Sequence, residues 1–132
     1  MTQDSAIVEL MSCIQSRIAA VHSRTYKGRA PEKDANGKPV KFPYAVWRLP
    51  NSTQQELPEE LILEVDTWDN KADTTALENL TSEIDGHLHG WNHVTDFYGM
   101  RVFRMNRLEV LDPDPAINRR KLRYLVRVYF IN

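Results

Sequence analysis

The chain has 132 residues, a formal net charge of −1, 42% hydrophobic residues and 27% charged residues. This length suits one domain, residues 1–132, and the composition excludes a disordered or fibrous protein. No apolar run approaches the roughly 20 residues of a membrane helix and no secretory signal is visible, so we expect no membrane association.

The first third of the chain predicts a helix followed by a long loop. Apolar residues recur at helical spacing through residues 5–22 and form one stripe: Ile7, Leu10, Met11, Ile14, Ile18 and Val21. Residues 23–41 are polar and are interrupted by glycine and proline, so we interpret them as a mobile loop. Loops of this length in compact domains are usually functional or disordered.

Two strands are predicted next, over residues 42–49 and 61–68, joined by a polar loop at 50–60. In the second strand Leu61, Leu63 and Val65 alternate with Glu64 and Asp66. This period of two places the carboxylates on the outward face of an antiparallel hairpin.

A second helix is predicted over residues 74–89, with a buried stripe of Leu77, Leu80, Ile84 and Leu88. Asp73 or Thr74 can cap its start, Thr75 and Glu78 fit a reciprocal capping pair, and Gly90 follows its end.

Strands at 97–111 and 120–131 follow, separated by a turn at Asp112-Pro113-Asp114-Pro115. The order α-β-β-α-β-β predicts an α+β fold in which two helices cover one face of a four-stranded, mainly antiparallel sheet.

Charge is unevenly distributed, because residues 56–69 are acidic and residues 101–127 are basic. Either these segments pair within one sheet, or they form complementary surfaces on neighbouring subunits. With the basic loop, they supply our candidates for a subunit or partner interface: Glu64, Asp66, Asp69, Arg123, Arg127, Lys27, Arg29, Lys33 and Lys38.

No residue pattern predicts a catalytic centre or a cofactor site. His87, His89 and His93 are weak candidates for metal ligands, but side chains two apart on a helix diverge by roughly 200°. The chain has no glycine-rich phosphate loop and no serine in a nucleophile elbow. We therefore expect a protein that is not an enzyme and has no cofactor.

The arginines of the last two strands suggest an alternative, a small α+β module that binds nucleic acid. Against this alternative, the sequence has no aromatic RNA-binding motif and no excess of positive charge.

Several segments together suggest a family. They are Phe42-Pro43-Tyr44-Ala45-Val46-Trp47, the acidic strand Glu64-Val65-Asp66-Thr67-Trp68-Asp69, the helix with Leu77, Leu80, Ile84 and Asp85, Phe103 followed by Arg107-Leu108, and Arg123-Tyr124-Leu125-Val126-Arg127-Val128. With the N-terminal helix, this order resembles the small tail-terminator (tail-completion, minor tail) proteins of long-tailed bacteriophages and prophages, over residues 5–130.

The resemblance implies a non-enzymatic virion component that is assembled in the bacterial host cytoplasm. Such proteins form rings, commonly hexamers, that cap the tail tube and join it to the head–tail connector protein. The implied partners are other copies of the chain, the tail-tube protein and the connector, with DNA only passing through the ring lumen. A head-closure or minor capsid protein at the same joint is a related alternative.

Overall fold

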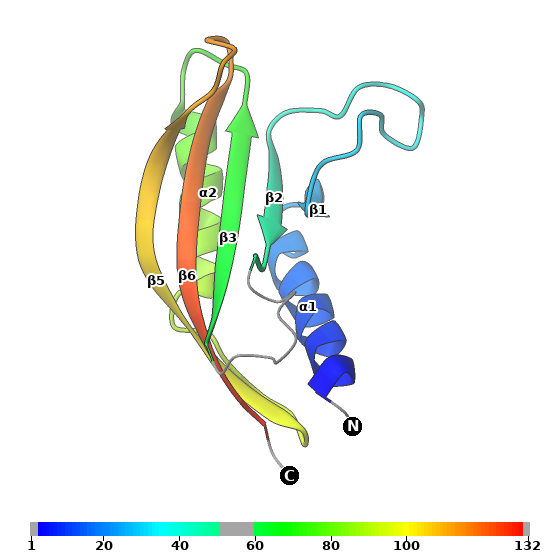
Figure 1. The fold of residues 1–132 in the computed structure, drawn as a ribbon. Helices are drawn as coiled ribbons and strands as arrows, with labels where there is room; N and C mark the ends of the chain where they lie inside the picture. The colour runs from blue at the N-terminus through cyan, green and yellow to red at the C-terminus, as the bar shows by residue number, and fades with distance from the viewer. Residues whose placement is uncertain (1–2, 51–59, 131–132) are drawn as a thin grey trace.

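The computed structural model describes residues 3–50 and 60–130. These residues form two helices and six strands: α1 (Gln3–Ala19), β1 (Thr25–Lys27), β2 (Tyr44–Arg48), β3 (Glu60–Asp69), α2 (Thr75–Leu88), β4 (Asn92–Val94), β5 (Tyr98–Leu111) and β6 (Asn118–Phe130). Neither helix is long and apolar enough to cross a membrane. The α+β class is confirmed, and Figure 1 shows the arrangement of the elements.

The strands form one mixed sheet in the order β1-β2-β3-β6-β5-β4. Strands β1 and β2 are parallel, and every other neighbouring pair is antiparallel. The prediction of a four-stranded sheet is therefore wrong, because β1 and β4 were missed. Each has three residues, too few for a periodic pattern, and each is held by pairing with a longer strand. Strand β1 also corrects the prediction that residues 23–41 are all loop.

Both helices pack on the same face of the sheet and share one core with it. Alternate residues of β3 and β6 point into this core, as the sequence predicted: Leu61, Leu63, Val65, Leu122, Tyr124, Val126 and Val128. Trp47 from β2 is fully buried, and its indole Nε1 donates to Gln15 Oε1 of α1 at 2.6 Å. The predicted loop at 50–60 falls largely on residues 51–59, which lie outside the described residues.

Helix α2 begins at Thr75, one residue after the predicted start, and its N-cap residue Thr74 makes no side-chain cap hydrogen bond. Asp73 Oδ1 instead accepts from the Thr75 backbone N–H at 2.9 Å. The prediction that Thr75 and Glu78 cap each other is wrong. The Glu78 carboxylate instead binds Arg107 and Arg120 of the sheet, at 2.7 and 2.5 Å. These two ion pairs fasten the first turn of α2 to β5 and β6.

The connection from β1 to β2 forms an arm, residues 28–43, that extends away from the sheet in Figure 1. The arm has its own turn, in which Asp34 Oδ1 accepts from the backbone N–H groups of Asn36 and Lys38. Gly37 adopts a φ of 76°, a backbone conformation that residues with a side chain rarely adopt. Most side chains between Gly28 and Lys41 are exposed, so the arm presents its surface outward.

Candidate functional site

The helix-free face of the sheet brings the acidic and basic segments side by side. Glu64 lies 3.2 Å from Lys121 Nζ and within 4 Å of the Arg48 and Arg123 side chains. Asp66 lies 3.6 Å from Arg119 and 3.9 Å from Lys121. Pairing within the sheet therefore accounts for these charges inside a single chain.

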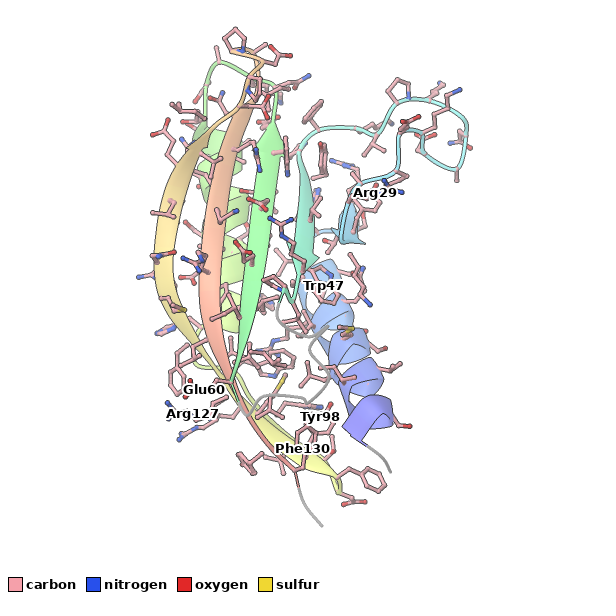
Figure 2. The ribbon with its side chains drawn as sticks, viewed as in Figure 1. Arg29, Trp47, Glu60, Tyr98, Arg127 and Phe130 are labelled. Atoms are coloured by element: carbon pink, nitrogen blue, oxygen red, sulfur yellow. The ribbon has the colours of Figure 1, made fainter. Side chains whose placement is uncertain are left out.

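The other interface candidates occupy separate places. Arg127 and Glu60 pair at 3.3 Å on the exposed end of β3 and β6, where Figure 2 labels both side chains. Asp69 is buried at the end of β3. Lys27, Arg29, Lys33 and Lys38 are exposed along the arm or at its base. Their role in contacts with other subunits remains a prediction.

The strand register determines which residues lie side by side in a row across the helix-free face. Tyr44, Trp68 and Arg119 are directly opposite one another on β2, β3 and β6. The Tyr44 and Trp68 rings stack with centroids 5.8 Å apart, and the Arg119 guanidinium lies 3.8 Å above the Trp68 ring. Cation–π contacts of this kind hold both groups in one orientation.

Beside this row lies a cavity of about 270 Å³, between the base of the arm and the sheet. Its lining includes Tyr44, Trp68, Asp66, Arg48, Arg119 and Arg29. Of these residues, only Asp66 and Arg29 are among the interface candidates predicted from the sequence. Aromatic side chains at the outward positions of predicted strands were the signal that could have found the site.

Strand β5 displays a second surface that sequence analysis missed. Met105, Leu108 and Leu111 are 51, 44 and 88% exposed. Strand β4 pairs only with Gly99–Arg101, so no described strand pairs with the outer edge of β5 from Met105 to Leu111. Exposed apolar side chains along an unpaired strand edge are typical of a protein contact surface.

The three histidines do not converge. His87 Nδ1 contacts the Glu83 carbonyl, His89 Nδ1 accepts from the Arg104 N–H, and His93 Nε2 lies 3.5 Å from Cys13 Sγ. Among residues 3–50 and 60–130, no group of three potential ligands could hold a metal ion.

Burial raises the pKa of Asp66 above the ordinary value of 3.8, against the opposing effect of the Lys121 and Arg119 charges. An acid with a raised pKa stabilises the fold most below pH 3.8, and this contribution is lost as the pH rises through the folded-state pKa. For Asp73, hydrogen bonds from Thr75 lower the pKa below 3.8. Carboxyl NMR titration should therefore show Asp66 releasing its proton at higher pH than Asp73, and the reverse order would contradict this assignment.

No family model and no curated protein matches this sequence. Among solved structures, the fold is similar to that of a chain in the virion of a native gene transfer agent particle. The match has a TM-score of 0.66 and 11% sequence identity, and it covers 87% of this chain and 90% of that chain. At this identity the likeness establishes a shared fold.

Proposed function

We propose that this chain is a non-enzymatic structural protein of a phage-type virion, a tail terminator. In this role it forms a ring, expected to be a hexamer, that caps the tail tube and joins it to the head–tail connector. It is assembled in the bacterial host cytoplasm, and DNA passes through the lumen of the ring.

The shared fold with the gene transfer agent chain is the observation that supports this role most strongly. The similarity extends over nearly the whole of both chains, so it is not limited to a common substructure. The sequence resemblance to tail-terminator proteins is a second support.

The surfaces of the chain also suit a ring, in which one surface of each subunit binds a different surface of the next. The apolar edge of β5, with Met105, Leu108 and Leu111, pairs with no strand of the described residues and is one such surface. The arm at residues 28–43 is a second, because its largely exposed side chains extend beyond the sheet.

The alternatives receive less support. A head-closure or minor capsid protein would also be a virion component, but the sequence resembles tail-terminator proteins. A nucleic-acid-binding module needs basic side chains available for phosphate, yet Lys121, Arg123 and Arg127 all lie within 4 Å of carboxylates of the same sheet.

Measuring the self-association of the chain tests the proposed ring. We expect sedimentation velocity to show an oligomer that grows with concentration, and negative-stain microscopy to show rings. The double substitution Leu108→Glu and Leu111→Glu should reduce the oligomer at least about tenfold, because it places charge in an apolar contact.

Val8→Glu is the matched control, since Val8 is 67% exposed on α1, away from the β5 edge. Circular dichroism of each variant checks that the monomer is folded. A wild-type protein that stays monomeric at every concentration contradicts the ring. An equal loss of oligomer with Val8→Glu would instead show that the subunit interface does not lie at the β5 edge.

A further inference from the structure

The cavity beside Trp68 holds buried polar atoms without hydrogen-bond partners. Asp66 is 6% exposed, and its Oδ1 has no hydrogen-bond partner among the described residues. The same is true of two donors beside it, Trp68 Nε1 and Arg119 Nε. A buried donor left unpaired costs about 1–3 kcal/mol, so a ligand that offers an acceptor to these two donors gains binding energy.

The ion pairs around the cavity are also too long to be hydrogen bonds. Arg119 lies 3.6 Å from Asp66 and 3.7 Å from Asp112, and Arg48 lies 3.7 Å from Glu64. Hydrogen bonds between charged groups normally measure about 2.7–2.9 Å. The guanidinium groups therefore retain donors that an additional acceptor could engage.

The charges of the residues that line the cavity indicate that this acceptor is an anion. Among the residues that line the cavity, Arg29, Arg48 and Arg119 are positive and Asp66 is negative, while Glu64 and Asp112 lie 3.7 Å from Arg48 and Arg119 without belonging to the lining. The donor atoms without partners, on Arg119 and Trp68, also require an acceptor. A carboxylate meets both requirements, because it is an anion with two acceptor oxygens.

The aromatic surroundings favour a protein as the source of the carboxylate. The Tyr44 ring contacts three other rings, those of Tyr26, Phe42 and Trp68, at centroid distances of 6.2, 5.2 and 5.8 Å, and the four form an aromatic cluster. These side chains are only partly buried, and they adjoin the arginines of the cavity. Trp, Tyr and Arg are the residues enriched at the centres of protein interfaces.

We infer that the cavity between the arm and strands β2, β3 and β6 binds an aspartate or glutamate side chain on an extended segment of a partner protein. The carboxylate engages Arg119 and Trp68 Nε1, and the flanking residues pack on the aromatic cluster of Tyr26, Phe42, Tyr44 and Trp68. This inference stands apart from the ring proposal, because it requires no self-association.

The test follows the Trp68 indole N–H by NMR during peptide titration. The chain has three tryptophans, and Trp68→Phe identifies the relevant signal by its loss. We expect acetyl-Ala-Glu-Ala-amide to shift this signal saturably, and acetyl-Ala-Gln-Ala-amide to bind about tenfold more weakly, as loss of one charge-assisted hydrogen bond implies.

Two cavity variants and one control locate the site. Arg119→Gln should weaken binding of the glutamate peptide at least about tenfold, and Arg48→Gln, at an exposed position, gives the same test if Arg119→Gln does not fold. Arg127→Gln lies on the same strand and face but outside the cavity, so it should change binding less than about twofold.

Three outcomes would overturn the inference. Equal binding of the glutamate and glutamine peptides would exclude carboxylate recognition. Equal affinity for acetate or inorganic phosphate would assign the cavity to a free anion. Tighter binding of a single-stranded oligonucleotide would assign it to nucleic acid instead.

Discussion

Replacing Trp47 with alanine should lower the free energy of unfolding by about 3–5 kcal/mol, the largest effect of any change considered for this chain. Trp47 is fully buried on β2, and its Nε1 donates to Gln15 of α1 at 2.6 Å. The substitution removes a large apolar volume between helix and sheet, and it also removes the donor that joins them. Urea unfolding monitored by far-UV circular dichroism measures the loss.

Trp47→Phe separates the two contributions. Phenylalanine keeps most of the apolar burial but cannot donate to Gln15, so we expect it to cost less than alanine does. Alanine should destabilise more than phenylalanine by at least about 1 kcal/mol. Alanine and phenylalanine variants of equal stability would show that Trp47 does not fill the core as described.

Replacing Glu78 with alanine should lower the free energy of unfolding by about 2 kcal/mol. Its carboxylate bridges Arg107 on β5 and Arg120 on β6 at 2.7 and 2.5 Å, and the Arg120 side chain is largely buried. Without Glu78, both guanidinium groups lose their carboxylate and the start of α2 loses its attachment to the sheet. Thermal or urea unfolding measures the effect.

Glu83→Ala is the matched control, because Glu83 is exposed on the same helix. Both substitutions remove one negative charge from α2 and add the same helix-favouring residue, so the two differ mainly in the contact to the sheet. We expect Glu83→Ala to change the stability by less than about 0.5 kcal/mol. Equal effects of the two changes would contradict a bridging role for Glu78.

The pairing of charges on the helix-free face changes where an assembly surface is expected. Glu64 and Asp66 are already within 4 Å of Lys121, Arg119 and Arg123 of their own chain, so they have little charge left for a neighbour. The apolar edge of β5, the exposed arm and the cavity beside Trp68 are better placed to contact other chains. For this reason the substitutions proposed above lie at the β5 edge and at the cavity beside Trp68.

The local pattern of the sequence determined both helices and the four long strands. The alternation of apolar and polar residues predicted which residues of β3 and β6 face the core. Asp73 and Gly90 marked the ends of α2. These features depend on residues near one another in the chain, so a single sequence suffices to find them.

The tertiary structure alone decided the strand neighbours and their register. Strands β1 and β4 form because longer strands offer them partners, and the parallel placement of β1 depends on the path of the arm. Register also decided that Tyr44, Trp68 and Arg119 meet in one row, although they are far apart in sequence. The sequence by itself therefore determined that the chain is an α+β protein with acidic and basic strands. The structure decided that those strands neutralise one another and enclose a cavity, because only long-range pairing brings such residues together.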